Sequence, residues 1–259
     1  MDWPRTLDSH RRLALIWPVC TLALLSPSDA GPHHAPLDGL PSLMLWAWER
    51  PEDLRGLDET VGVAYLAQTI TLSGDQISLQ PRRQPLRVST KARLMAVTRI
   101  EVPPTGLTPA EATLDVVATL IAKTRTAPRV AGLQIDFDAR ASERDYYRRL
   151  LDAVRAQVGS TPLTITALAS WCVGDRWMEN LPVDEAVPML FRMGPEDALY
   201  RGLAGSPRLG ATTCQGAVGV SLDEPLGVER GKRRLYVFGP RSWNTHTVAD
   251  AKRQAGRSR

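Results

Sequence analysis

Eight short apolar or β-branched runs recur along the chain, separated by segments with helix or turn patterns. This alternation of strand and helix implies parallel strand pairing with right-handed crossovers. Eight is also the number of parallel strands that closes a (β/α)₈ barrel. The runs span residues 43–49, 61–67, 93–100, 130–138, 162–169, 186–191, 216–222 and 233–239.

Two of the intervening segments have the marks of crossover helices. Thr108 and Glu111 have the spacing of a capping box, with Pro109 at the first helical position. A second helix opens at residues 142–145 and ends at Gly159. We therefore expect helices after the third and fourth strands.

Between the second and third strands the pattern predicts a β-hairpin instead of a helix. Polar and apolar residues alternate from Thr69 to Arg93, around a Ser73-Gly74-Asp75 turn. The chain has 259 residues, which after loss of a leader is slightly short of the ~250 typical of these barrels. We predict an α/β fold: a single-domain, trimmed (β/α)₈ TIM barrel at 41–243, with a linker at 31–40 and a C-terminal helix and basic tail at 244–259.

The first thirty residues have the order of a secretory signal peptide. Arg11 and Arg12 precede an apolar run from Leu13 to Leu25, and small residues follow as far as Ala30. The run is shorter than the roughly 20 residues of a membrane-spanning helix, and an uncleaved anchor is the alternative. We expect residues 1–30 to direct export to the periplasm or the extracellular space, with no stable membrane span after their removal.

Composition excludes several kinds of site. The four His and three Cys have no metal-ligand spacing, no nucleotide-binding motif is present, and the 32 basic residues are scattered among 28 acidic ones. We therefore expect no metal, no cofactor, no nucleic-acid partner and a monomer. Cys172 and Cys214 remain in the exported chain, either as a disulfide or as two buried thiols.

The fourth predicted strand carries the most informative residues. Because side chains alternate along a strand, Gln134, Asp136 and Asp138 share the face toward the lumen. At ~3.3 Å per residue the two aspartates are roughly 6.6 Å apart, so each raises the cost of ionising the other. Carboxyl ends of barrel strands carry the chemistry of this fold, which makes both aspartates catalytic candidates. Alternatively, Asp138 caps a helix and Asp136 pairs with a buried arginine.

Glycoside hydrolysis needs an acid and a second carboxylate about 5 to 10 Å apart. We expect Asp138 to be the acid, Asp136 to tune it electrostatically, and Glu49 at the end of the first strand to be the second carboxylate. The other candidates for that role are Glu101 and the Asp223-Glu224 pair. Acidic residues at strand ends are also commonly solvated or cap helices.

Five tryptophans of the mature chain fall at or near the carboxyl ends of predicted strands. A flat ring with an N–H donor suits a sugar, whose C–H face stacks while its hydroxyls seek donors. Trp46 and Trp48 share a strand face and could instead belong to the core. Arg192 could face an anionic group in the lumen or pair with Asp136. The candidate binding residues are Trp48, Trp171, Trp177, Arg192 and Glu224.

Three stretches resemble a bacterial family of unknown function, number 3142 in the domain-of-unknown-function series. They are residues 133–138 (LQIDFD), 163–171 (LTITALASW) and 218–225 (VGVSLDEP), and the similarity covers roughly residues 40–240. The resemblance implies an exported barrel related in fold to glycoside hydrolases. More distantly, the first stretch is similar to the chitinase-like strand in which alternating aspartates lead to a glutamate acid. Arg140 stands at the position of that acid here, which removes the proton donor of the chitinase mechanism, and a chitinase would need another strand to supply it.

These patterns together predict a glycoside-hydrolase-like barrel that acts on a carbohydrate or cell-envelope glycan by carboxylate-based hydrolysis. The alternative is an inactive barrel that binds a glycan or an envelope partner. A third possibility is a purely structural envelope protein, with both aspartates paired inside and no open cleft. The surroundings of Asp138 distinguish among the three.

Overall fold

The computed structural model describes residues 37–196, 199–200, 202, 210–225 and 231–256. The predicted signal peptide and residues 31–36 of the predicted linker lie outside these ranges. No helix within the described ranges is both long and apolar enough to cross a membrane.

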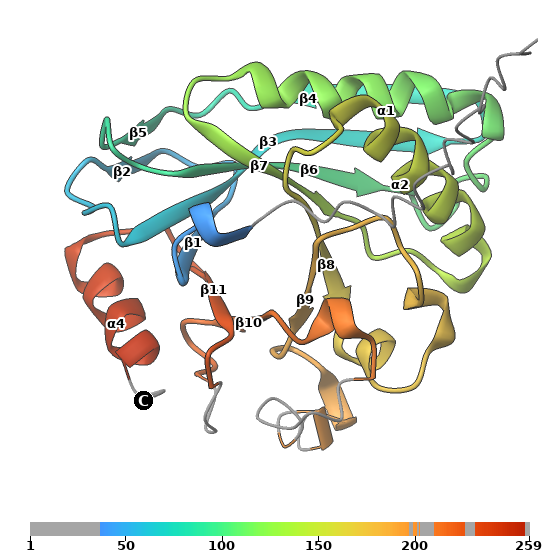
Figure 1. The fold of residues 1–259 in the computed structure, drawn as a ribbon. Helices are drawn as coiled ribbons and strands as arrows, with labels where there is room; N and C mark the ends of the chain where they lie inside the picture. The colour runs from blue at the N-terminus through green and yellow to red at the C-terminus, as the bar shows by residue number, and fades with distance from the viewer. Residues whose placement is uncertain (1–36, 197–198, 201, 203–209, 226–230, 257–259) are drawn as a thin grey trace, which may run out of the picture. The chain divides into compact units, whose positions relative to one another are not determined.

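Eight parallel strands close into a barrel, as the sequence predicts (Figure 1). The first strand pairs with the last strand and with β3, so the ring has no open edge. Most boundaries agree with the predicted runs, but β3 continues well past its run. In order around the barrel the strands are β1 (Leu43–Ala47), β11 (Arg234–Phe238), β10 (Ala217–Ser221), β9 (Glu185–Met189), β8 (Leu163–Leu168), β7 (Val130–Asp136), β6 (Leu94–Glu101) and β3 (Val61–Ser73).

The extension of β3 forms the hairpin predicted between the second and third barrel strands. It pairs antiparallel with β4 (Gln76–Pro81), and Ser73 faces Gln76 across the turn. Gly74 has φ of +58° there, a conformation that glycine adopts without steric cost. A separate pair of short parallel strands, β2 (Glu52–Leu54) and β5 (Leu86–Val88), lies outside the barrel sheet.

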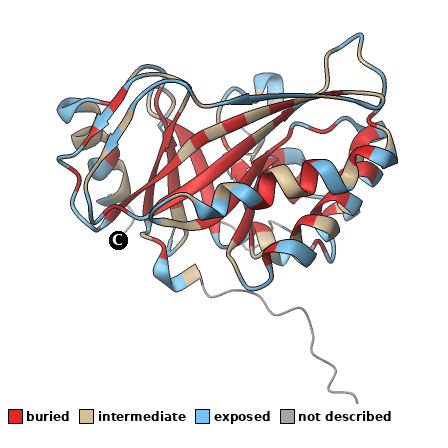
Figure 2. Ribbon diagram, turned by 90° about the horizontal axis from the view of Figure 1, so that it is seen from above, coloured by how far each residue is buried: buried red, intermediate tan, exposed pale blue. Residues whose placement is uncertain are grey.

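Helices cover two parts of the outer barrel wall. The helices α1 (Leu114–Lys123) and α2 (Arg144–Val158) pack their apolar faces on the outer residues of β6, β7 and β8 (Figure 2). The C-terminal helix α4 (Thr245–Gly256) packs against the outer residues of β1. Short 3₁₀ helices occupy the connections: η1 (Leu37–Gly39), η2 (Glu111–Thr113), η3 (Thr124–Thr126), η4 (Ala141–Glu143), η5 (Ala169–Cys172), η6 (Arg176–Met178), η7 (Gly194–Glu196) and η8 (Thr212–Cys214).

The first crossover helix begins later than its capping pattern predicts. The helical turn starts at Glu111, and Ala110 precedes it without a side-chain cap. The Leu107 carbonyl accepts from the Gly74 amide at 3.2 Å, and the Ala110 amide donates to the Gly74 carbonyl at 2.7 Å. These bonds to the hairpin turn hold Thr108 and Pro109 out of the helix, so the expected capping box does not form.

Alternating side chains divide the barrel strands into an inner and an outer set. The inner set forms an apolar cluster that includes Met44, Trp46, Met95 and Tyr236. Polar inner residues are paired with each other: the Trp46 indole Nε1 donates to Gln134 Oε1 at 2.9 Å. The lumen is therefore a packed core as far as this layer, and only its ends can hold a site.

A disulfide joins Cys172 of η5 to Cys214 of η8, with 5.9 Å between the Cα atoms. Both cysteines are buried in the same cluster as Ala186, which lies on the outer side of β9. The bond ties the segment after β8 to the segment before β10, and of the two alternatives left open by the sequence it is the one found.

Candidate functional site

Asp136 ends β7 and lies between polar residues of both neighbouring strands. The register of β6 against β7 sets Arg99 beside it, and Arg99 Nη1 donates to Asp136 Oδ2 at 2.7 Å. Thr166 of β8 donates its hydroxyl to the other carboxylate oxygen at 2.7 Å. Asp136 is buried, so these two partners compensate for its lost hydration. Its arginine partner is Arg99 and not Arg192, which corrects one of the sequence alternatives.

Asp138 follows two residues later on the same side, but its carboxyl group is open to solvent on one side. The side chain is 47% exposed, and Arg99 Nη2 lies 3.8 Å from Asp138 Oδ2. Partial burial raises the pKa of Asp138, the negative charge of Asp136 raises it further, and Arg99 opposes both. Asp138 therefore holds its proton to higher pH than an ordinary aspartate.

The two aspartates lie at a cleft of about 480 Å³ at the carboxyl ends of the strands. Trp48, Phe191 and Phe238 form an aromatic wall, with ring centroids 6.4 Å apart for Trp48 and Phe238 and 4.9 Å for Phe191 and Phe238. The cleft thus combines an apolar wall with a titratable carboxyl group, the usual composition of a small-ligand site.

Arg192 also lines this cleft, where Asp223 and Glu224 hold it. Its guanidinium lies 3.3 Å from Asp223 and 3.7 Å from Glu224, and Glu224 accepts the Arg192 backbone amide at 2.9 Å. Arg192 has φ of +53°, which is uncommon for a residue with a side chain. Glu224 is not among the residues that line the cleft, and its observed contacts orient Arg192.

The structure places Glu49 outside the cleft. Its carboxylate accepts the backbone amides of Arg83 and Gln84 at 2.7 and 2.9 Å, and it borders another cavity of about 200 Å³ next to β4. These two amides belong to the segment just after β4, so the carboxylate of Glu49 is held beside that segment and not at the cleft. Glu49 is therefore not brought together with Asp136 and Asp138.

Four of the five expected rim tryptophans are also elsewhere. Trp171 is buried in the helix-side core, where its ring meets Trp177 edge-on at 4.8 Å beneath the guanidinium of Arg144. The 3₁₀ turn η5 and the disulfide at Cys172 direct this segment outward, which corrects the expected rim position of both rings. Trp46 fills the lumen and Trp243 is buried. Trp48 alone among the five lines the cleft.

Sequence reasoning missed Arg99, Thr166, Phe191 and Phe238. A signal for Arg99 was present, since it continues the alternation of Met95 and Val97 on the inner face of the third predicted strand. The aromatic wall had a weaker signal, because its rings come from strand ends that are distant in the sequence.

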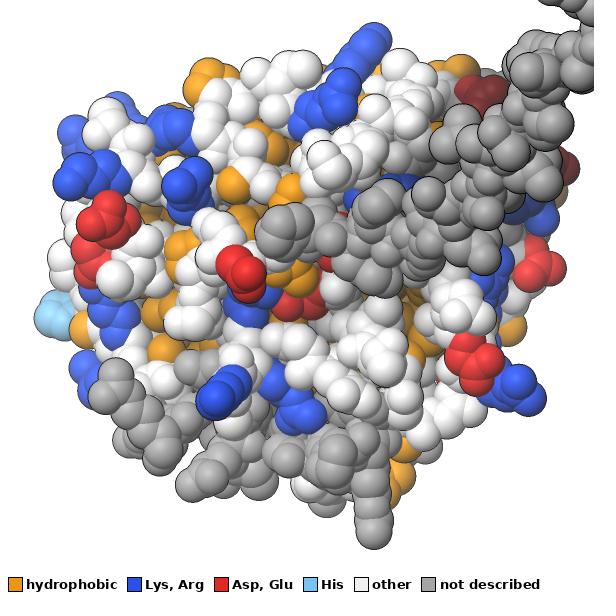
Figure 3. Space-filling view, viewed as in Figure 1, with side chains coloured by type: hydrophobic (Ala, Val, Ile, Leu, Met, Phe, Trp, Pro, Cys, Tyr) orange, Lys and Arg blue, Asp and Glu red, His pale blue; other side chains and the backbone are white. Residues whose placement is uncertain are grey.

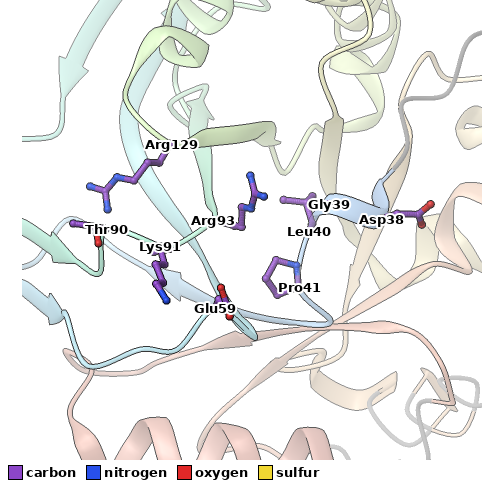
Figure 4. Close-up of a pocket in the computed structure, with 10 residues that line it drawn as sticks. Asp38, Gly39, Leu40, Pro41, Glu59, Thr90, Lys91, Arg93 and Arg129 are labelled. Carbon is purple, nitrogen blue, oxygen red and sulfur yellow. The ribbon is translucent and has the colours of Figure 1, made fainter.

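A further cavity of about 550 Å³ lies at the opposite end of the barrel (Figure 4). Its residues come from the segments just before β1, β3, β6 and β7, and they include Lys91, Arg93, Arg129 and Glu59. The amino-terminal face of this fold usually serves stability, so the cleft at Asp138 is the better candidate site.

Charge and metal ligands give no competing site among the described residues. On the face in Figure 3, basic side chains lie among acidic and uncharged ones without forming a continuous stripe. Within the described ranges no group of three or more His, Cys, Asp or Glu residues could hold a metal ion.

The chain is similar in fold to solved structures, one of which is a glycosidase. The apo crystal structure of an endo-beta-N-acetylglucosaminidase from Cordyceps militaris matches with a TM-score of 0.48 and 10% identity, over 85% of this chain and 91% of that chain. Likeness at this level carries no argument about the reaction. No family model and no curated protein matches the chain, so the resemblance to family number 3142 stays a prediction.

Proposed function

We propose that the cleft at the carboxyl ends of the strands binds a carbohydrate and that Asp138 is the general acid of a glycoside hydrolysis. The observation that carries this proposal is a half-exposed carboxyl group with a raised pKa in an aromatic-walled cleft. General acids work best when their pKa approaches the working pH, and this environment moves Asp138 in that direction.

The surroundings give each group a role. Asp138 donates its proton to the glycosidic oxygen as the C–O bond breaks, and water then adds its hydroxyl to the anomeric carbon and returns a proton to Asp138. Arg99 and Thr166 hold the Asp136 carboxylate in place. Its negative charge raises the pKa of Asp138 and stabilises positive charge on the sugar ring. Trp48 offers its face to the sugar C–H groups.

A second candidate function is glycan binding without hydrolysis. Asp136 and Asp138 are the only carboxylates among the described residues that line this cleft, and both oxygens of Asp136 already have partners. Glu101 lines the adjoining cavity beside Asp138, where it is paired with Arg99 at 2.9 Å. A retaining or inverting mechanism needs a second carboxylate that is free to act as nucleophile or base, unless the substrate supplies the nucleophile. This observation favours the binding function.

Substitution Asp138→Asn separates the two functions. For a hydrolase, we expect turnover of the cleaved member of a glycan panel to fall by about 100-fold or more, with binding retained. Asp152→Asn, an exposed aspartate on α2, is the matched control and should keep full turnover. Retained turnover in Asp138→Asn contradicts its role as acid. Binding by both variants without turnover by the wild type supports the binding function.

We also propose that the protein is exported. The charge and apolar order of residues 11–30 and the disulfide between Cys172 and Cys214 support this, because disulfides persist in oxidising compartments. Amino-terminal sequencing of the protein from an envelope or culture fraction tests it: a mature start near residue 31 is expected, and an intact leader in a cytosolic fraction contradicts it.

A further inference from the structure

Asp138 borders two cavities. Arg99 and Asp138 line both the cleft described above, of about 480 Å³, and a second cavity of about 530 Å³. We call the first the aromatic arm, after Trp48, Phe191 and Phe238. We call the second the proline arm, since Pro103 and Pro104 form part of its wall.

From this arrangement we propose that the two arms together bind one carbohydrate chain that passes over Asp138, so that the ligand is an oligosaccharide or polysaccharide contacted internally and not a terminal sugar. The proposal rests on the carbohydrate function above and specifies its substrate class. A general acid in a glycosidase lies beside the bond between two sugars. An acid at the closed end of one pocket fits a terminal sugar, whereas an acid between two cavities fits a bond inside a chain.

The sizes and linings of the arms agree with this assignment. Each volume falls within the ~300 to 1,000 Å³ of cavities that hold ligands of several rings. The aromatic arm offers ring faces, and the proline arm adds charged groups on Glu101 and Arg140. Both side chains are about half exposed, and they pair with Arg99 and Glu143 respectively. Exposed, pre-oriented groups of this kind can bond sugar hydroxyls without a large ordering cost.

The experiment measures affinity against ligand length. Oligosaccharides of about two to six rings, drawn from β-1,3-, β-1,4- and N-acetylated series, are titrated by calorimetry into Asp138→Asn protein, which cannot cut them under the proposed mechanism. The substitution Pro104→Trp, at an exposed turn position, fills the proline arm. The substitution Pro128→Trp is the matched control, because Pro128 is also an exposed turn proline but borders neither arm.

We expect affinity to rise with length until both arms are filled. Pro104→Trp should weaken the longest ligand by about tenfold or more, the equivalent of one or two hydrogen bonds, and leave the shortest ligand unchanged. Pro128→Trp should match its parent at every length. An affinity that stops rising once the aromatic arm is filled, or a Pro104→Trp variant that binds the longest ligand normally, overturns the proposal.

Turnover by the wild type keeps the two proposals apart. If length dependence and the Pro104→Trp effect hold but nothing is cut, hydrolysis is wrong and the two-arm site stands. If terminal sugars are released and Pro104→Trp has no effect, hydrolysis stands and the two-arm site is wrong. If no ligand in the panel binds, both are overturned.

Discussion

The barrel lumen holds an acid–arginine pair at each end, and the two pairs differ in how they are closed. At the amino-terminal end, Arg234 pairs with Glu185 at 2.5 Å and also donates to the backbone carbonyls of Leu37 and Pro41. The Tyr236 hydroxyl donates to Glu185 at 3.1 Å. Only 11% of the Arg234 side chain and 1% of the Glu185 side chain are exposed. This pair is closed on every side that the structure describes.

The carboxyl-terminal pair has similar chemistry and an open side. Arg99 holds the buried Asp136, but it also reaches toward Asp138, which borders both the aromatic arm and the proline arm. An acid and an arginine therefore seal the lumen at one end, and at the other they leave the neighbouring carboxyl group of Asp138 open to a cavity. The backbone segment at residues 37–41 accounts for the difference, since it covers Arg234 and no segment among the described residues accepts hydrogen bonds from Arg99 in the same way.

A raised carboxyl pKa alone does not distinguish the two ends of the barrel lumen. Burial raises the pKa of Glu185 in spite of the Arg234 charge and the Tyr236 hydroxyl, and burial together with Asp136 raises the pKa of Asp138. Buried ion pairs that serve structure shift pKa values just as active sites do. Access to a cavity is the property that distinguishes Asp138 from Glu185 and makes it the candidate functional group.

The substitution Arg234→Met is the strongest test of the closed end. It leaves Glu185 buried without its cation, and removing one member of a buried pair costs about 3 to 5 kcal/mol. We expect that loss in the free energy of unfolding measured by chemical denaturation, with glycan affinity of the folded protein unchanged. Arg87→Met, at an exposed arginine on β5, should change stability by no more than about 0.5 kcal/mol. A loss below about 1 kcal/mol for Arg234→Met contradicts a structural role for this pair.

Sequence periodicity was sufficient for the barrel and for the direction of its side chains. Alternation placed Asp136 and Asp138 on the lumen face, and the same alternation points Arg99 inward. It could not pair Arg99 with Asp136, because that contact depends on the register between β6 and β7. Register comes from packing of the whole sheet and not from the pattern within one strand.

Positions after a strand end were predicted less well than positions within a strand. Glu49 lies two residues beyond the end of β1 and Trp171 three residues beyond the end of β8, yet neither lines the cleft. Backbone amides of the segment after β4 hold Glu49 aside, and the turn η5 with the disulfide at Cys172 directs Trp171 into the outer core. Both causes are contacts with distant segments, which a single strand pattern does not contain.

Substitution of Trp48 and of Trp177 tests whether the ligand binds in the cleft, which Trp48 lines and Trp177 does not. Trp48→Leu removes a ring from the aromatic arm, and we expect glycan affinity to fall roughly tenfold, since aromatic contacts contribute about 0.5 to 1.5 kcal/mol beyond burial. Trp177→Leu makes the same change outside the cleft and should leave affinity unaltered. Calorimetric titration checks both. Equal losses of glycan affinity in the two variants would show that Trp177 also contributes to binding and would contradict this assignment.

The smallest expected effect is in the pH dependence of stability, and it separates the open carboxyl group from the closed one. Because the pKa of Asp138 is raised on folding, its proton stabilises the folded state fully below the ordinary value of 3.8, and this stabilisation is lost as pH rises through the folded pKa. Asn cannot ionise, so Asp138→Asn should gain stability relative to the wild type across that window and keep a constant advantage above it. Asp152→Asn should show no such change.

A bound ligand distinguishes the two carboxyl groups. A ligand that covers Asp138 should move the Asp138 window, whereas the Glu185 window, of the same sign, should stay fixed because Glu185 is buried away from the cleft. Denaturation at several pH values, with and without the longest bound oligosaccharide, measures both windows. Glu185→Gln protein lacks the Glu185 window, so a ligand-dependent shift in the pH dependence of its unfolding free energy is expected to come from Asp138.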